Sequence, residues 1–306
     1  MKLAYARVRG GNLGDDLNPW LWPRLLPEGF GADADDDVVL FGIGTILNAA
    51  RGAAVPARAR AVHVFSSGAD DVSPLPALDA RWTLHCVRGP LTARRFGRPE
   101  LAVGDGAYLL HHLVPRTEVR AGIGFMPHHR SEEWVDWAAV SERLGWRFIS
   151  AKGSVDSRLA ALNSVERLVT EAMHGAIIAD ALRVPWTPVR FSPRFGEAKW
   201  HDFGGALELS PRIHALPLVF QHRDPWPRLL THATKRGFRS RTGRGPKKWE
   251  RLVVTWPVAG ERALDELALA LGGVERDAPV ALSTDAALQR VVGELQVRLE
   301  RLRQVL

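Results

Sequence analysis

The sequence predicts an α/β protein made of two successive sets of βα units and a helical C-terminal extension. Three observations carry this prediction. Short apolar runs end in glycine-rich or small polar turns and are followed by helical segments, which is typical of strands in a parallel sheet. The pattern stops at Leu113–Arg120, where Pro115 interrupts it, and then starts again. From Ser283 onward, leucine and valine recur at alternating spacings of four and three.

The first set of units is expected to form one parallel sheet with its helices. Its expected strands are Lys2–Val8, Val38–Phe41, Ala61–Phe65, Trp82–Val87 and Leu101–Val103. Its expected helices are Leu17–Leu26 and Leu91–Phe96. Ligands of parallel sheets bind at the carboxyl ends of the strands. We therefore expect the functional residues of this half in the turns that follow the strands.

The second set repeats the pattern and defines the expected domain boundaries. Its expected strands are Gly122–Met126, Trp146–Ser150, Arg167–Thr170 and Thr187–Arg190. Its expected helices are Trp134–Leu144, Asp156–Asn163 and Ala176–Leu182. The sequence thus divides into an N-terminal domain (1–116), a C-terminal domain with the second set (117–230), and a basic linker with a helical tail (231–306).

The expected tail helix has a heptad seam with Ser283 as a plausible N-cap. Its apolar positions are Leu288, Val292, Leu295, Leu299, Leu302 and Leu306. The repeat is shorter than the three or four heptads that indicate a coiled coil. Two alternatives therefore stay open: the helix packs back onto the body, or it pairs with a second copy to form a homodimer.

The composition is that of a globular protein, with 46% hydrophobic and 25% charged residues. Cys86 is the only cysteine, so no intrachain disulfide forms, and we expect a reducing, cytoplasmic setting. Met1–Gly10 has no apolar core, so no secretory signal is expected. The apolar stretch Val38–Leu47 is too short for a membrane span, which needs about 20 residues.

The formal net charge of +7 is concentrated in one segment, Lys235–Arg251, which has eight basic residues and one acidic residue. A nucleic-acid-binding domain usually spreads its charge over the binding face, so no nucleic-acid partner is expected. Two interpretations remain. The segment contacts anionic lipid head groups or a lipid-linked diphosphate, placing the protein at the inner face of the membrane, or it is a solvated linker.

The turn after the first expected strand contains Asn12, Gly14, Asp15 and Asp16. Its glycines allow backbone N–H groups to approach a ligand, but the spacing is not that of a dinucleotide fingerprint. Two adjacent aspartates disfavour phosphate and suit general-base work or hydrogen bonds to sugar hydroxyls. The structural alternative is that either aspartate caps the following helix.

The turn Glu171–Gly175 is the strongest functional signal in the sequence. It places His174 between a strand and a helix rich in small residues, where a side chain faces a cleft and not the core. A lone histidine is more often structural, but this location favours a functional role. Adjacent histidines such as His128 and His129 lack carboxylates at ligand spacing, so no metal site is expected.

These turns together resemble the polysaccharide pyruvyl transferases, and the resemblance is closest to the succinoglycan-type (ExoV-like) branch. The order and spacing of the motifs are similar from the N-terminus to about Trp200. The matching elements are Asn12-Leu13-Gly14-Asp15, Gly42-Ile43-Gly44, Val87-Arg88-Gly89, Gly104-Asp105, and Met173-His174-Gly175 followed by Val184-Pro185. The family usually has an arginine two residues before the histidine, where this chain has Ala172.

The resemblance implies a GT-B-like fold of two Rossmann-like domains and transfer of pyruvate from phosphoenolpyruvate, without a cofactor or metal. The implied acceptor is a sugar of a cell-surface glycan or a lipid-linked oligosaccharide. The implied catalytic residues are His174, as the acid or as the group that stabilises the departing phosphate, and Asp15 or Glu171, which would remove hydroxyl protons. The implied substrate-binding residues are Arg88, Lys199, Asn12, Gly14, Gly44, His128, Arg130 and Gly175. Arg130 or Arg158 is expected to replace the arginine absent at Ala172.

Two other functions fit part of this pattern. A GT-B glycosyltransferase that uses a nucleotide sugar would also have two Rossmann-like halves, and its His-Gly turn would hold a diphosphate. A non-catalytic glycan-binding homologue would account for the missing arginine. Binding of phosphoenolpyruvate separates both alternatives from a pyruvyl transferase.

Overall fold

The first sheet is built from the N-terminal third of the chain. The structure is a computed structural model that describes residues 1–31, 34–192, 195–219 and 260–306, and also 231, 234–235, 237–239 and 241–243. Four parallel strands follow one another in chain order: β1 (Lys2–Ala4), β2 (Val38–Phe41), β3 (Ala61–Phe65) and β4 (Trp82–Cys86). Every residue of β2 is buried, as expected for a continuous apolar run inside a parallel sheet.

The helices of this half connect and cover the strands. They are α1 (Leu13–Leu25), α2 (Pro27–Phe30), α3 (Ala49–Ala53) and α4 (Pro90–Arg95), with the 3₁₀ turns η1 (Pro99–Leu101) and η2 (Gly106–His112). The expected strand Leu101–Val103 is wrong. Pro99 lacks an N–H and starts η1, and only one isolated bridge, between Val87 and Ala102, continues the sheet there.

The second sheet has five parallel strands in the order β6-β5-β7-β8-β9. Its strands are β5 (Ile123–Met126), β6 (Arg147–Phe148), β7 (Arg167–Thr170), β8 (Trp186–Arg190) and β9 (His214–Ala215). Its helical elements are η3 (Ser131–Glu133), α5 (Trp137–Arg143), α6 (Val155–Asn163), α7 (Met173–Ala181) and α8 (Glu197–Ala206). The fold is therefore α/β with two parallel sheets, as the sequence predicts.

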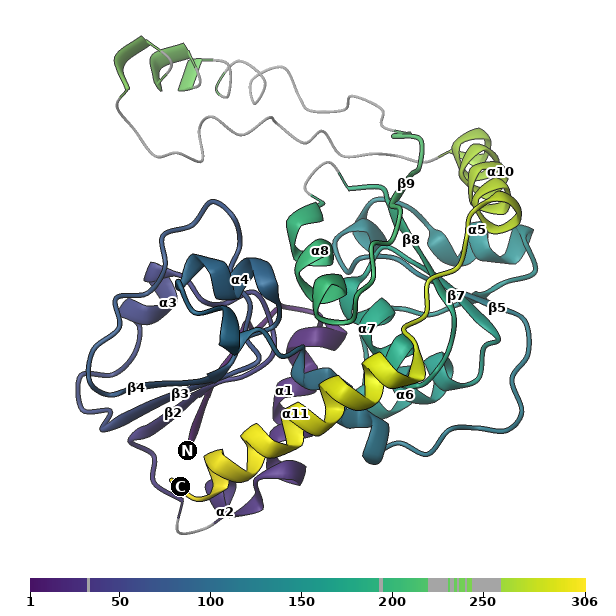
Figure 1. Cartoon of the computed structure of the whole chain (residues 1–306). Coiled ribbons are helices and arrows are strands. Elements are labelled where there is room, and N and C mark those ends of the chain that lie inside the picture. The colour runs from purple at the N-terminus through teal and green to yellow at the C-terminus, as the bar shows by residue number, and fades with distance from the viewer. Residues whose placement is uncertain are drawn as a thin grey trace.

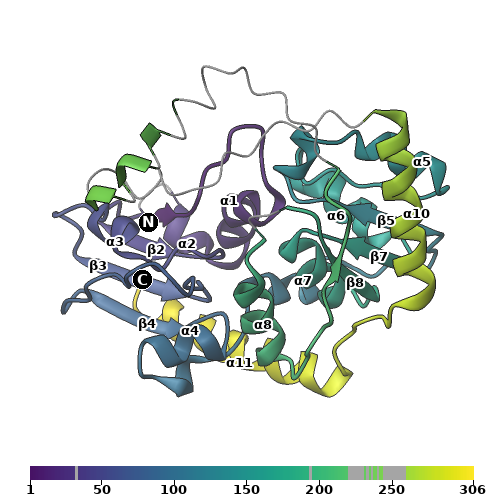
Figure 2. The same ribbon diagram turned by 90° about the horizontal axis from the view of Figure 1, so that it is seen from above.

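Helix α1 lies between the two halves. It appears there both in the front view (Figure 1) and in the view from above (Figure 2), and it contacts α6 and α7 of the second half. One hydrophobic core cluster contains Trp22 of α1 together with Leu168 of β7 and Ile177 of α7. The two halves are thus joined by a continuous apolar interior.

The C-terminal part returns to both halves. Helix α10 (Glu261–Asp277) packs on α5, and Asp180 of α7 accepts hydrogen bonds from Ser283. Helix α11 (Asp285–Arg303) then runs beneath the molecule and contacts η2 and β4 (Figure 1). Thr284, not Ser283, supplies the cap, because its side chain accepts from the Ala287 N–H.

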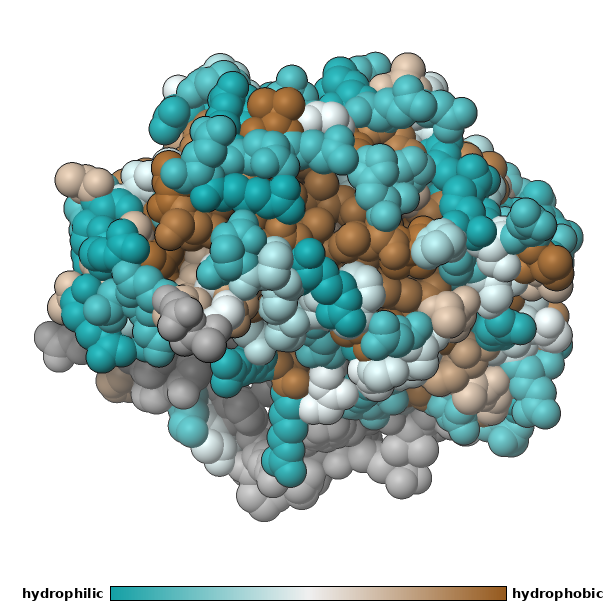
Figure 3. Space-filling view, turned by 90° about the horizontal axis from the view of Figure 1, so that it is seen from below, coloured by the Kyte–Doolittle hydropathy of each residue, from teal (hydrophilic) through white to brown (hydrophobic). Residues whose placement is uncertain are grey.

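The heptad face of α11 is used within the chain. Leu288, Val292, Leu295, Leu299 and Leu302 are all buried in the shared core. The tail helix therefore packs back onto the body, the first of the two alternatives. In the view from below, the side on which Figure 1 places α11, hydrophilic side chains border apolar areas near the middle of the face (Figure 3).

Two expectations concern membranes. Among the described residues, no helix combines the length and the apolar character needed to cross a bilayer. Most of the basic segment Lys235–Arg251 lies outside the described residues.

Candidate functional site

The N-terminus of α1 forms one wall of a cleft. The helix begins at Leu13, four residues earlier than expected, because the motif is itself the first helical turn. The N-cap residue is therefore Asn12 and neither aspartate, and Asp16 Oδ2 accepts the Asn12 backbone N–H at 2.9 Å from within the helix. Asp15 instead lines the cleft, where Asn12 Nδ2 donates to its Oδ2 at 2.6 Å. Burial raises the pKa of Asp15, against this hydrogen bond and the nearby His174.

The turn after β2 forms the floor beside Asp15. Asn18 of α1 fixes this turn: its Oδ1 accepts the Ile43 N–H at 2.8 Å and its Nδ2 donates to the Ile43 carbonyl at 3.1 Å. Gly44 has φ of 122°, a conformation that favours glycine, and it lies next to Asp15 Oδ1. Thr45 follows Gly44 and also lines the cleft.

The N-terminus of α7 packs against that of α1, and both line the cleft. His174 lies in its first turn and is mostly buried. A Cβ atom on Gly14 would lie 2.0 Å from His174 Nδ1, so only glycine fits against the imidazole. Gly175 is also restricted to glycine, because a Cβ atom there would lie 2.7 Å from Met126 Sδ. The helix N-terminus adds partial positive charge at this wall.

A group of nitrogen-bearing side chains completes the cleft. Burial lowers the pKa of Lys199 to about 8, reinforced by the positive charge of Arg88 and opposed by Glu171 and Asp15. Burial also lowers the pKa of His128 to about 2 and that of His129 to about 4, and neighbouring cations act in the same direction. Both histidines are therefore neutral hydrogen-bonding groups at physiological pH. Arg130 is exposed at the mouth.

Arg88 lies behind this surface and does not line it. Its side chain is fully buried and makes an ion pair with Asp202 of α8 at 2.9 Å. Its Nη1 donates to Thr45 Oγ1 at 2.6 Å. An arginine has only donors, so Thr45 must accept this bond, and its own hydroxyl proton is left for another acceptor. Arg88 thus reaches the cleft through Thr45.

Glu171 is buried beneath the loops of the second sheet and is not among the cleft-lining residues. Its Oε2 accepts the His128 N–H at 3.1 Å, and its Oε1 accepts the N–H groups of Phe191 (3.1 Å) and Ser192 (2.7 Å). Burial raises the pKa of this carboxyl, and these bonds oppose the shift. The carboxylate therefore ties the turn after β5 to the turn after β8.

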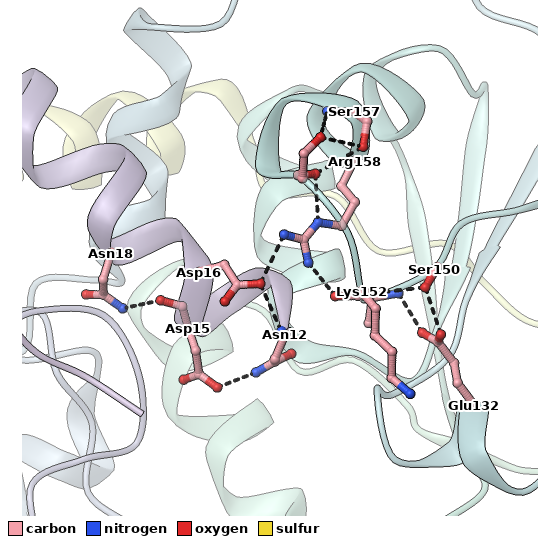
Figure 4. Close-up of polar contacts among 11 residues, drawn as sticks. Asn12, Asp15, Asp16, Asn18, Glu132, Ser150, Lys152, Ser157 and Arg158 are labelled. Carbon is pink, nitrogen blue, oxygen red and sulfur yellow. Dashed lines mark hydrogen bonds and ion pairs between the residues drawn. The ribbon is translucent and has the colours of Figure 1, made fainter. Parts of the chain in front are cut away.

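Arg158 also stands behind the wall. Its Nη2 donates to Asp16 Oδ2 at 3.1 Å, and its Nη1 and Nε donate to the carbonyls of Ala151 and Ser154 (Figure 4). The Ala151 carbonyl accepts the Leu13 N–H as well, at 2.9 Å. The start of α1 is thereby fixed to the loop between β6 and α6, so Arg158 connects the two halves of the molecule.

The cleft has a volume of about 310 Å³ and lies where the carboxyl ends of the two sheets face each other. Asp15 lies within electrostatic reach of His174, and Lys199 lies within reach of His128, His129 and Asp15. Such a site can hold an anion and exchange protons with it. Within the described part of the chain, no group of three or more His, Cys, Asp or Glu side chains is arranged to hold a metal ion.

The whole chain aligns with a curated protein. It is 32% identical over 326 residues to the succinoglycan biosynthesis protein ExoV of Rhizobium meliloti (strain 1021), and the alignment includes 100% of this chain and 98% of that protein. The chain belongs to the ExoV-like family. No family model matches the sequence, and no solved structure matches it.

The structure gathers most of the residues that the sequence selected in this ExoV-like chain. Those that line the cleft are Asn12, Gly14, Asp15, Gly44, His128, Arg130, His174, Gly175 and Lys199. Arg88 and Glu171 lie behind it. Ala172 does line it, and of the two arginines expected to replace the absent one, Arg130 lines it and Arg158 does not.

Sequence reasoning missed three side chains of this ExoV-like site. Thr45 and His129 line the cleft. Asp105 lies behind it with Oδ2 at 3.6 Å from His174 Nε2. The Gly104-Asp105 turn was a recognisable signal, because it belongs to the motif series that resembles the family, but nothing in the sequence shows which residue faces that aspartate.

Proposed function

We propose that this chain transfers pyruvate from phosphoenolpyruvate to a sugar in exopolysaccharide biosynthesis and forms a ketal. The observation that carries the proposal is the joint presence of His174, Asp15 and Lys199 in one cleft of an ExoV-like chain. The relative's name supports a role in polysaccharide biosynthesis. Phosphoenolpyruvate as donor rests on the motif resemblance and on the cationic side of the cleft.

Binding of the donor is assigned to the groups that favour an anion. Phosphoenolpyruvate carries close to three negative charges, so the site needs cations and donors. Lys199 and Arg130 supply charge, and the neutral His128 and His129 supply hydrogen bonds without the repulsion that further cations would cause. In this proposal Arg130 takes over from the arginine that is absent at Ala172.

The chemical steps follow from the proton-active groups. His174 protonates C3 of phosphoenolpyruvate, which makes C2 oxocarbenium-like. A sugar hydroxyl adds to C2 and loses its proton to Asp15, a carboxyl whose pKa is raised by burial and which is therefore a stronger base than an exposed aspartate. The C2–O bond to phosphate breaks, and a second hydroxyl closes the ketal. In the net reaction the acceptor loses two hydroxyl protons. C3 gains one proton, delivered by His174, and the released phosphate carries the other.

The experiment is phosphate release from phosphoenolpyruvate in the presence of a glycan or lipid-linked oligosaccharide acceptor. Release is expected with the wild-type protein and is abolished in His174→Ala. Thermal stabilisation by phosphoenolpyruvate is measured beside stabilisation by UDP- and GDP-sugars. Stabilisation by a nucleotide sugar alone would make the chain a GT-B glycosyltransferase, and stabilisation by a glycan alone would make it a non-catalytic binder.

We also propose the setting of this reaction. The two parallel sheets with a cleft between them support a GT-B-like arrangement of two Rossmann-like domains. The basic segment Lys235–Arg251 supports peripheral contact with the inner face of the membrane, where a lipid-linked acceptor is located. Co-sedimentation with anionic but not neutral lipid vesicles is expected, and it is lost when the segment is made neutral. A homodimer stays a prediction, and the heptad face of α11 that suggested it is buried within the chain.

A further inference from the structure

Asp105 is a buried carboxylate, and only one of its two oxygens accepts a hydrogen bond from the described residues. It lies between η1 and η2, as the N-cap residue of η2, and has no solvent exposure. Its Oδ1 accepts the Ala107 N–H at 3.0 Å and so caps η2. Its Oδ2 has no hydrogen-bond partner among the described residues. A buried carboxylate oxygen without a donor is costly, so this atom calls for an explanation beyond the cap.

The imidazole of His174 has a nitrogen that could donate to this oxygen. Its Nε2 is buried and also lacks a hydrogen-bond partner within the described residues. The two atoms face each other at 3.6 Å, although Asp105 comes from the first half of the chain and His174 from α7 in the second. This separation is longer than a formed hydrogen bond, and such bonds at catalytic sites are often long before the substrate is present.

The opposite edge of the imidazole adjoins the cleft. Nδ1 is the ring atom nearest to Gly14, and both Gly14 and His174 line the cleft. The charged groups near the ring are Asp105 behind it and Asp15 on α1, and Lys199 of α8 acts in turn on Asp15. A proton on Nε2 satisfies the Asp105 oxygen and leaves the Nδ1 lone pair toward the cleft.

We infer that Asp105 is a positioning residue that holds the Nε2–H tautomer of His174, so that Nδ1 is the nitrogen that exchanges a proton with the substrate. The inference rests on the proposed function for what Nδ1 does, but the pairing itself does not. Because the two residues come from different halves, the pair forms only when the halves are docked. Catalytic competence is thereby tied to the contact between the sheets.

A substitution can separate the capping of η2 by Asp105 from the effect of Asp105 on the His174 tautomer. Asp105→Asn keeps an oxygen that accepts the Ala107 N–H, but its amide presents N–H donors where His174 needs an acceptor. Asp180→Asn is the matched control, because Asp180 is an equally buried carboxylate that bonds Ser283 and Trp186 instead. Both variants remove one buried charge, and only the first changes the group that faces His174.

The test is nitrogen-15 NMR of the histidine rings in the free protein, in buffer alkaline enough to keep the imidazole neutral, with His174→Ala used to assign the signal. The Nε2–H tautomer is expected in the wild type and in Asp180→Asn, and the Nδ1–H tautomer in Asp105→Asn. An Nδ1–H tautomer in the wild type, or an unchanged tautomer in Asp105→Asn, overturns the inference.

Kinetics supply the second readout. In Asp105→Asn we expect kcat for phosphate release to fall by about 10²- to 10⁴-fold, as when the tautomer-fixing carboxylate of a catalytic histidine is replaced, with little change in KM. Asp180→Asn keeps wild-type kcat after correction for its folded fraction. Absence of phosphate release by the wild type contradicts the proposed function and leaves the NMR result to decide the pairing. Full kcat in Asp105→Asn contradicts the positioning role.

Discussion

Arg88 Nη1 donates a 2.6 Å hydrogen bond to Oγ1 of Thr45, so a fully buried guanidinium acts on the cleft through a hydroxyl. The other guanidinium contacts are with Asp202, which also accepts the N–H groups of Leu91 and Thr92. Arg88 is therefore part of the contact between α4 and α8. Its charge is held in place by the same aspartate that joins the two halves.

The first prediction concerns the hydroxyl of Thr45. Thr45→Val removes the donor that faces the cleft and leaves Arg88 Nη1 without its partner, so KM for phosphoenolpyruvate is expected to rise by about 10- to 100-fold. Thr45→Ser restores the hydroxyl and should restore KM. Steady-state kinetics measure both. Equal KM values for the valine and serine variants would contradict a role for this hydroxyl.

The second prediction is a pH dependence set by Lys199. Its pKa of about 8 means that the ammonium is present below that pH and is lost above it. Binding of phosphoenolpyruvate, measured by calorimetry, should therefore weaken as the pH rises through about 8. Lys199→Arg keeps its charge and should keep binding at higher pH. Lys152→Arg, outside the cleft, should leave the wild-type profile unchanged.

The same pKa has the opposite effect on stability. The unfolded chain, with an ordinary lysine pKa of 10.5, binds more protons than the folded chain between about pH 8 and 10.5. The contribution of Lys199 to the free energy of unfolding therefore rises with pH in this window. Urea unfolding of wild type and Lys199→Met should show a steeper rise for the wild type. Parallel curves would mean that the ammonium is well solvated.

The third prediction tests the contact between Gly14 and His174. Gly14→Ala places a Cβ 2.0 Å from Nδ1, so the imidazole must move, and kcat should fall by about 100-fold because misplacement by 1 Å costs that much. Gly293→Ala adds the same methyl group to α11, where no atom beyond its own helical backbone lies within 4 Å, and should keep full activity. A fully active Gly14→Ala protein would show that His174 is not needed in this position.

The fourth prediction tests whether Glu171 has a structural role in place of the catalytic role expected from the sequence. Because its carboxylate accepts three backbone N–H groups, Glu171→Ala should lower the free energy of unfolding by about 3 kcal/mol or more. Glu171→Gln keeps one acceptor oxygen and should lose less. Urea unfolding measures both. If Glu171 instead removes a substrate proton, Glu171→Gln would lose activity while remaining as stable as the wild type.

Several strands could be predicted to the residue. Val38–Phe41, Ala61–Phe65 and Arg167–Thr170 agree with β2, β3 and β7 because each is a short apolar run that ends at a polar or glycine turn. The cleft followed from the same rule, since parallel strands bring their carboxyl ends to one edge. Boundaries failed where a functional motif was itself helical, as at Leu13.

The positions of the buried charges could not be predicted. Arg88 and Asp202 are 114 residues apart, and no local pattern says that they meet. The contacts of Glu171 were equally hidden, because its partners are backbone N–H groups of turns that only the folded sheet brings together. Arg88 and Glu171 both lie in turns at strand ends, where exposed functional residues and buried structural residues have the same sequence pattern. Only the direction of the side chain separates them.

The last prediction tests the packing of the tail helix against its own chain. Leu295 of α11 has no exposed surface, whereas Val297 in the same helix is 48% exposed. Leu295→Ala should lower the free energy of unfolding by about 2–5 kcal/mol, and Val297→Ala should change it by less than about 0.5 kcal/mol. Urea unfolding at two protein concentrations is the measurement. A loss that is the same at both concentrations follows from packing within one chain. A loss that depends on concentration, with dissociation of a dimer in Leu295→Ala, would instead assign the heptad face to a second copy.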